Sequence, residues 1–373
     1  MFRLHVRPHW SLQRPGQTDF DLPVVLRLCA AVHEGGSLAQ AARQIGLSYR
    51  HAWGLLREAE QVFARPLVEL ERGRGGRLTR LGEILLWADR RIAARLSPAL
   101  DSLSSELNAE IERVLTSVAP VRIQASHGFA VQALQETLVE SGLHIDLRYT
   151  NSVDALQALA RQECDLAGFH VPEGHLQAAG LSPYRVALQG APLQLINLAT
   201  RVQGLMLPQG NPRGIRHWDD LAESPVRFIN RQPGSGTRLL IDLLLREERV
   251  LPERISGYEM WEYTHAAVAA YIASGMADVG FGIEAAARRF QLDFLPMASE
   301  RYFLACRADA GTHPDLTAVF TLLRAGELRR RIGALPGYNS DACGSVITLA
   351  DAFPDSFPPA NADRERAPDP AVL

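Results

Sequence analysis

The chain has 373 residues, of which 47% are apolar and 22% charged, the composition of an ordinary soluble globular protein. This length suggests two or three domains. No run of about 18 apolar residues occurs, which excludes a membrane-spanning helix. The first 20 residues lack an apolar run with a small-residue cleavage site, so we expect no signal peptide and a cytoplasmic protein. This expectation argues against a periplasmic transport protein.

Charge is distributed unevenly along the chain. The chain contains no lysine, so all of its 39 Lys and Arg residues are arginines. Residues 1–100 hold 15 Arg against 9 acidic residues, a formal +6, whereas the other 273 residues hold 24 Arg against 33 acidic residues, a formal −9. A basic end on an acidic chain predicts that this end meets a polyanion.

The stretch EGGSLAQAARQIGLSYRHAWGLLREAEQVF predicts two short helices joined by a tight turn. Ser37 can cap a helix over residues 38–44, and Gly46 can end that helix in the left-handed conformation. Ser48 can cap a second helix over about 49–62. This order is the helix-turn-helix arrangement, in which the second helix enters the major groove of DNA.

The next stretch, RPLVELERGRGGRLTRLGE, predicts a strand, a tight turn and a second strand. An arginine-rich hairpin beside a helix-turn-helix forms a wing that can contact phosphates or the minor groove. We therefore expect this end of the chain to bind double-stranded DNA. The residues expected to contact it are Ser37, Ser48, Tyr49, Arg50, His51, Trp53, Arg57, Arg72, Arg74 and Arg77.

The motif GSLAQAARQIGLSYRHAWGLLREAEQVFARPLVE, followed by RGGRLTRLGE, resembles the winged-helix domain of LysR-type regulators and, more closely, of molybdate-responsive ModE-type regulators. The resemblance covers about residues 20–95 and implies a homodimer, or a dimer of dimers, on a palindromic operator. We place this domain at residues 1–81. Residues 82–118 have helical apolar repeats, and in such regulators this segment is the linker and the dimer seam. Pro98 is expected to kink it.

After Val121, strands and helices alternate, which predicts an α/β fold with parallel strands and crossover helices. Two such lobes joined by a hinge resemble a type 2 periplasmic-binding-protein fold. The stretches NRQPGSGTR and ASGMADVGFGIEAAA are similar to the PBP-like domain found with molybdenum-related regulators and molybdopterin biosynthesis proteins. We place this domain at residues 119–345, with its second lobe at about 195–290. Residues 346–373 are expected to be a disordered tail.

The stretch NRQPGSGTRLLID, residues 230–242, predicts an anion site. It lacks the lysine and spacing of a nucleotide-binding P-loop, and it does not match GxGxxG. What remains is a strand, a glycine turn and a helix N-terminus, whose free amides and dipole attract anions. Polar residues after the other strands share that edge of the sheet. The expected ligand-binding residues are Ser126, His127, Thr150, Asn151, Ser152, His170, Ser235, Gly236, Thr237, Arg238, Tyr263 and Thr264.

No catalytic pattern such as GxSxG or HExxH occurs, so we expect no enzyme and no catalytic residues. The four cysteines lie far apart and form no CxxC pair, so we expect reduced thiols, no protein-ligated metal cation and no covalent cofactor.

The sequence thus predicts a DNA-binding transcription regulator that contacts no membrane. A small anion is expected to control it by closing its two lobes. By family resemblance this effector is molybdate or tungstate. A regulator that senses the molybdenum cofactor, or a small carboxylate such as formate, stays open. So do two functions of another class, a molybdenum-cofactor assembly enzyme and an intracellular oxyanion carrier.

Overall fold

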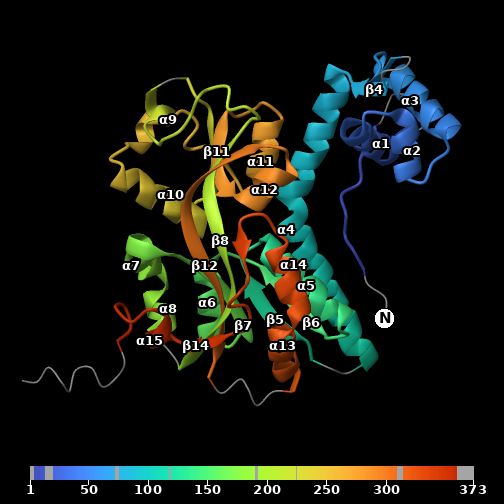
Figure 1. The fold of residues 1–373 in the computed structure, drawn as a ribbon. Coiled ribbons are helices and arrows are strands. Elements are labelled where there is room, and N and C mark those ends of the chain that lie inside the picture. Colours follow the sequence, from blue (N-terminus) through green and yellow to red (C-terminus); the bar gives the residue numbers. More distant parts are fainter. Residues whose placement is uncertain are drawn as a thin grey trace, which may run out of the picture.

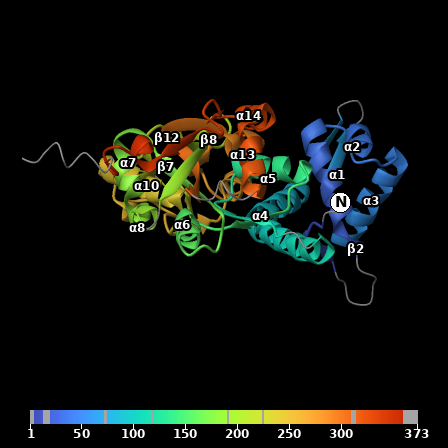
Figure 2. The same cartoon turned by 90° about the horizontal axis from the view of Figure 1, so that it is seen from below.

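The computed structural model describes residues 4–12, 20–71, 75–116, 119–189, 192–223, 225–308 and 314–358. These residues form an N-terminal domain, one long helix and a domain of two lobes (Figure 1). In the view turned by 90°, the N-terminal domain lies to one side of the two lobes (Figure 2).

The N-terminal domain packs three helices beside a hairpin. Its elements are β1 (Ser11–Leu12), β2 (Phe20–Asp21), α1 (Leu22–Gly35), α2 (Leu38–Gln44), α3 (Tyr49–Phe63), β3 (Val68–Glu71) and β4 (Gly75–Leu78). The predicted helix starts are confirmed: the Ser37 hydroxyl accepts the amide of Gln40 at 3.5 Å, and the Ser48 hydroxyl accepts the amide of His51 at 3.2 Å. Gly46 follows α2 at φ +77°, the left-handed turn that the sequence predicts.

The long helix α4 (Arg80–Thr116) leads from this domain to the lobes and continues through Pro98. Because proline has no amide hydrogen, the carbonyl of Ala94, four residues earlier, receives no backbone amide from Pro98, although the Ser97 hydroxyl donates to it at 3.3 Å. The chain before α1 returns to α4: the amide of Leu4 donates to Asn108 Oδ1, and the amide of Val6 donates to Ser104 Oγ, both at 2.9 Å.

One mixed sheet runs through both lobes, in the strand order β10-β9-β11-β8-β12-β7-β5-β6. Lobe I contains β5 (Val121–Ala125), α5 (Phe129–Glu140), β6 (Ile145–Tyr149), α6 (Ser152–Ala160), β7 (Leu166–Pro172), α7 (Gln177–Leu181), α8 (Arg185–Gln189), α13 (Pro314–Arg324), α14 (Gly326–Gly333), β13 (Tyr338–Asn339), β14 (Val346–Thr348) and α15 (Leu349–Ala352). Lobe II contains α9 (Asp220–Glu223), β9 (Phe228–Arg231), α10 (Gly236–Glu247), β10 (Trp261–Glu262), α11 (His265–Ala273), β11 (Val279–Ile283) and α12 (Glu284–Arg289).

Two long strands, β8 (Leu193–Leu207) and β12 (Asp293–Arg307), join the lobes. They pair antiparallel along their whole length, with irregular register between Pro296 and Ala298 and between Tyr302 and Phe303. In Figure 1 they run from lobe I through to lobe II. The hinge is therefore a hydrogen-bonded ribbon, and both lobes share its backbone.

Helices cover both faces of the sheet in each lobe. In lobe I, α5, α13 and α14 pack on one face, and α6, α8 and α15 pack on the other. In lobe II, α10 packs on one face, and α11 and α12 pack on the other. Because both faces are covered, the strands are apolar almost throughout: every residue of β7, β9 and β11 is buried.

The four cysteines are buried free thiols. Burial raises the pKa of Cys29 and of Cys164 to about 12, so these two sulfurs stay protonated at neutral pH. They fill apolar space, as small buried hydrophobic residues do.

The prediction of a disordered tail from residue 346 is wrong for the residues up to 358. β14 pairs with β8, with Ile347 opposite Leu195. Phe353 is fully buried against Phe303, with ring centroids 5.5 Å apart. These short apolar elements complete one face of lobe I. Residues 359–373, where the tail is also expected, lie outside the described part of the chain.

Replacing Phe353 with Ala should lower the free energy of unfolding by about 3–5 kcal/mol, because it empties a packed position in lobe I. Phe357→Ala is the matched control, since that ring is only partly buried and packs at the edge of the same core. Urea denaturation measures both. Equal small losses in the two variants would show that residues 346–358 do not belong to the core.

Candidate functional site

A cavity of about 620 Å³ lies between the two lobes. Its wall includes residues at, or just before, the N-termini of four helices, α5, α6, α10 and α11. Such helix ends attract anions through their free amides. The lining residues are Arg95, Leu96, Pro98, Ala99, Ser126, His127, Tyr149, Thr150, Asn151, Ser152, His170, Arg201, Arg231, Gln232, Ser235, Gly236, Thr237, Tyr263 and His265.

On the lobe I side, hydroxyls and rings hold each other in place. Ser152 Oγ lies 3.4 Å from His170 Nδ1, and Ser126 Oγ lies 3.1 Å from the Tyr302 hydroxyl. The His170 and Tyr302 rings stack with centroids 5.8 Å apart. This part of the wall is therefore ordered by its own contacts.

On the lobe II side, Ser235 lines the cavity and is also the N-cap of α10. Its hydroxyl accepts the amide of Arg238 at 3.2 Å and donates to the carbonyl of Gln232 at 2.9 Å. The next residue, Gly236, faces lobe I: a Cβ atom there would lie 2.2 Å from Nε2 of His170. The two lobes thus meet at this glycine, and the contact requires the absence of a side chain.

Arg201 and Arg231 bring two buried cations to the cavity wall. Among the described residues, two buried carboxylates lie near them: Glu300 is paired with Arg201, and Glu262, opposite Arg231 in the pairing of β9 and β10, is paired with Arg95 at 3.8 Å. Arg201 Nε donates to Glu300 Oε1 at 2.5 Å. Arg231, 7% exposed, donates from Nη2 to the carbonyl of Tyr263 at 2.8 Å. Within the described part of the chain, no acceptor is bonded to its Nε and Nη1. Burial and the Arg201 cation lower the pKa of Arg231 to about 9.

Three histidines complete this part of the wall. Burial lowers the pKa of both His127 and His170 to about 4, and the pKa of His265 well below its usual value; the Arg231 cation adds to the effect at all three. The rings are therefore neutral at pH 7, and each can donate one N–H without adding charge. The positive charge of the site comes from arginine.

The structure brings ten of the twelve predicted ligand-binding residues to the cavity wall. These ten are Ser126, His127, Thr150, Asn151, Ser152, His170, Ser235, Gly236, Thr237 and Tyr263.

Arg238 and Thr264 do not line the cavity, which corrects the prediction for both. Arg238 pairs with Asp242 at 3.1 Å and lies over the Tyr258 ring, because it is one residue too far along α10 to face the cavity. The Thr264 hydroxyl accepts the amide of Ala267 at 2.9 Å and donates to the carbonyl of Ala94.

Sequence reasoning missed the two buried arginines of the cavity, Arg201 and Arg231. Arg231 had a signal, since a charged residue ending an apolar strand directly before the predicted anion loop is out of place in a core. Arg201 lies inside the long strand β8 and has no local signal. Four residues of α4 in the cavity wall also have no local sequence signal: Arg95, Leu96, Pro98 and Ala99.

The predicted DNA-contacting residues of α3 lie on an open surface. Tyr49 is 53% exposed and Trp53 43%, and Arg50 and His51 are exposed as well. A buried helix would hide such rings, so this face is available to a partner. Arg57 lies over the Trp53 ring at 5.0 Å.

The hairpin is fixed to the turn before α2. The amide of Gly76 donates to the carbonyl of Gly36 at 2.8 Å, and a Cβ on Gly75 would lie 2.1 Å from that oxygen. Arg77 pairs with Glu69 across the hairpin at 2.9 Å. The other two predicted contacts of the wing, Arg72 and Arg74, lie outside the described residues.

Comparison with known protein families agrees with these two surfaces. Residues 24–83 match the bacterial regulatory helix-turn-helix protein of the lysR family, and residues 133–324, about half of the chain, match the PBP superfamily domain. The chain belongs to the LysR-type transcriptional regulators with a PBP superfamily domain. The regulator is therefore a DNA-binding protein and not an enzyme.

Three curated relatives match this chain over different lengths. The uncharacterized protein YvgK of Bacillus subtilis (strain 168) is 31% identical over 215 residues, 58% of this chain and 67% of that protein. The HTH-type transcriptional regulator CbbR of Xanthobacter flavus is 27% identical over 252 residues, 64% of each chain. The molybdenum-pterin-binding protein MopB of Rhodobacter capsulatus is 26% identical over 185 residues, 48% of this chain and 67% of that protein.

Among the residues that the structure describes, no helix is both long and apolar enough to cross a membrane.

Replacing Arg231 with Met should raise the free energy of unfolding by about 1–3 kcal/mol, because it removes a buried charge that the protein does not fully pair. The matched control is Arg238→Met, which breaks the contacts to Asp242 and Tyr258 and should lower stability. Thermal and urea denaturation of the purified regulator measure both. A lower stability of Arg231→Met would mean that the protein itself balances this cation.

Proposed function

We propose that the regulator binds a small anion between its lobes and that this anion controls its binding to operator DNA in the cytoplasm. The observation that carries the proposal is Arg231, whose Nε and Nη1 lack acceptors among the described residues while the guanidinium is buried beside Arg201. Buried polar groups are almost always hydrogen-bonded, and buried charges are paired. An anion in the cavity supplies both the acceptors and the charge.

We propose a tetrahedral oxyanion of the molybdate or tungstate type as the effector. Its oxygens suit the donors of this cavity: the Arg231 guanidinium, hydroxyls such as those of Ser126 and Thr237, and helix-end amides. The molybdenum-pterin-binding name of the MopB relative supports the same element.

A larger molybdenum-containing anion, such as a pterin-bound form, is the second candidate, and the size of the cavity favours it. One water takes about 30 Å³, so an oxyanion of about five heavy atoms fills only part of the roughly 620 Å³. Tyr149 and Tyr263 give this cavity aromatic surface on both lobes. A small carboxylate such as formate uses the same donors and leaves still more of the cavity to water.

The mechanism is a shift between populations of an open and a closed form. The anion contacts residues of both lobes, so it binds the closed form more tightly and favours closure. A 10- to 100-fold difference in affinity between the two forms amounts to roughly 1.4–2.7 kcal/mol of coupling to DNA binding.

We propose that α4 is also the seam of a homodimer. Leu96, Leu103, Leu107 and Val114 are exposed apolar residues on this helix, separated by seven, four and seven positions. This is the spacing of a heptad seam between two helices.

The test is calorimetric titration of the metal-stripped regulator with molybdate, with sulfate, phosphate and formate as controls. Heat with molybdate alone is the expected result. Arg231→Met should abolish this heat. The double variant Ser235→Ala/Thr237→Ala should weaken molybdate binding at least about tenfold, because it removes the Thr237 hydroxyl and the Ser235 cap that orders the N-terminus of α10. If none of the four anions gives heat, the oxyanion hypothesis is wrong and the larger molybdenum-containing anion is the remaining candidate.

Arg50→Ala separates the two surfaces. It should weaken DNA binding, because an exposed guanidinium of α3 is lost, while molybdate binding stays unchanged. Gel-shift and calorimetric titrations give the two affinities. Loss of both affinities together would contradict the division into a DNA-binding and an anion-binding domain.

Leu103→Glu should convert the dimer to a monomer, because it places a charge in the apolar seam. Light scattering after gel filtration measures the mass. Val186→Glu is the matched control, since Val186 is an exposed apolar residue on lobe I, away from α4. A Leu103→Glu protein that remains dimeric would move the seam to another surface.

A further inference from the structure

A break in the hydrogen bonding of α4 is filled by lobe II. Pro98 lies within α4 and lines the cavity. Because Pro98 has no amide hydrogen, the carbonyl of Ala94 receives no backbone amide from it. The hydroxyl of Thr264 donates to this carbonyl at 3.0 Å, from a residue 170 positions away in the chain. The proline thus creates the acceptor that holds the linker helix to lobe II.

Thr264 is also part of the cavity's framework. It is the N-cap of α11, where its hydroxyl accepts the amide of Ala267 at 2.9 Å, and the residue is 2% exposed. The residues on either side of it, Tyr263 and His265, line the cavity, and the Tyr263 carbonyl accepts from Arg231 at 2.8 Å. One hydroxyl therefore connects the anion-facing end of α11 to α4.

The half of α4 before Pro98 belongs with lobe II and with the DNA-binding domain. Trp87 packs against Phe290 of lobe II with ring centroids 6.4 Å apart, and it meets His33 of α1 at 5.8 Å. Arg90 pairs with Glu34, also of α1, at 2.7 Å. A movement of lobe II therefore carries this half of α4, and the DNA-binding domain with it.

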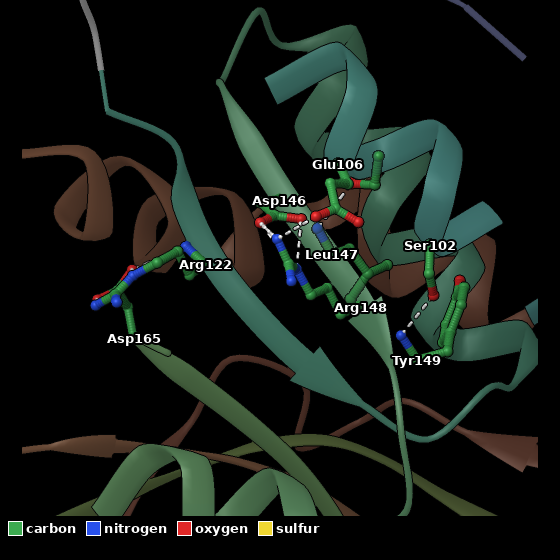
Figure 3. A network of polar contacts seen from close by, with 9 residues as sticks. Ser102, Glu106, Arg122, Asp146, Leu147, Arg148, Tyr149 and Asp165 are labelled. Atoms are coloured by element: carbon green, nitrogen blue, oxygen red, sulfur yellow. Dashed lines mark hydrogen bonds and ion pairs between the residues drawn. The ribbon is translucent and has the colours of Figure 1, made fainter. Parts of the chain in front are cut away.

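The half of α4 after Pro98 belongs with lobe I. Ser105 and Ser102 accept the amides of Leu147 and Tyr149 at 2.8 and 2.9 Å, on the outer edge of β6. Figure 3 shows this helix against the strand, with Glu106 beside Arg148. The two halves of α4 thus contact different lobes. They meet at Pro98, where the helix lacks one backbone hydrogen bond.

We propose that Thr264 is a positioning residue that passes occupancy of the cleft to the linker helix within one subunit. When the lobes close on the anion, α11 moves with lobe II and pulls on the Ala94 carbonyl. Helix α4 bends at Pro98, and the DNA-binding domain turns relative to lobe I. This inference rests on the proposed anion in the cleft, but it assigns the coupling to one hydrogen bond outside the cavity.

The test weakens the hydrogen bond between the Thr264 hydroxyl and the Ala94 carbonyl in two ways. Thr264→Ala removes the donor, and Pro98→Ala restores a helical amide that competes for the Ala94 carbonyl. In the full-length regulator, 1 mM molybdate should change the affinity for a duplex selected from a random library by about tenfold or more. In each single variant, molybdate should still bind but should change the DNA affinity by less than about twofold. The double variant should lose no more of this response than either single variant. Thr264→Ser, which keeps the hydroxyl, should restore the full response.

Two controls separate this role from a general loss of stability. Thr348→Ala removes the N-cap of α15 in lobe I, away from the cleft. Ser97→Ala removes a hydroxyl of α4 that donates to the Ala94 carbonyl at 3.3 Å from within the helix itself. Both should keep the molybdate response. A Thr264→Ala protein that responds normally overturns the proposal, as does an effect of equal size in Thr348→Ala.

The same set of proteins distinguishes failure of this inference from failure of the proposed effector. If the wild-type regulator shows no response to molybdate, the effector is wrong, and the role of Thr264 is judged on DNA binding without any anion. Releasing α4 from lobe II should then change the basal DNA affinity of Thr264→Ala by about fivefold or more, with Thr348→Ala unchanged. Equal basal affinities would overturn the proposal.

Discussion

A buried arginine at the cleft, Arg231, lacks a full set of hydrogen-bond partners among the residues that the structure describes. Where the lobes meet, Arg231 contributes a charge and two donor atoms that no acceptor in the described part of the chain bonds. The nearby carboxylates of Glu300 and Glu262 are already paired with Arg201 and Arg95. A buried charge of this kind destabilises the protein unless something of opposite sign joins it. The neighbouring histidines are neutral, so they add no further positive charge, and an imidazole carries no negative charge that could balance the guanidinium. The cleft is therefore a place where folding leaves an electrostatic deficit that a ligand can remove.

The parts of this molecule that the sequence predicts well are those whose signals are local. Ser37, Gly46 and Ser48 each act on residues within one helical turn, so the two helices of the helix-turn-helix could be placed almost to the residue. Ser235 is a signal of the same kind, since a capping serine after a strand and a glycine turn specifies a helix start. The side chains around Ser235 reach the cavity because parallel strands end at one edge of the sheet.

The parts that could not be predicted depend on partners far away in the chain. Thr264 carries the local signal of a cap, which is correct, but its second partner is in a helix 170 residues earlier. Arg201 looks like an ordinary polar residue of a strand until the fold places Glu300 beside it. The composition of the C-terminal residues predicts disorder, whereas Ile347 and Phe353 find their partners in lobe I. In each case tertiary contact overrides the local pattern.

The ribbon of β8 and β12 limits how the lobes can move. A pair of strands bonded along its whole length bends as one elastic strip, whereas two single connecting chains could swivel independently. Its pairing is already irregular at Pro296–Ala298 and at Tyr302–Phe303, so flexing is easiest there. We therefore expect the lobes to move mainly by bending of this ribbon, so that anything attached to one lobe is displaced in a repeatable direction. In the proposed homodimer, such guided motion gives the spacing of the two α3 helices along a double helix only a narrow range of values.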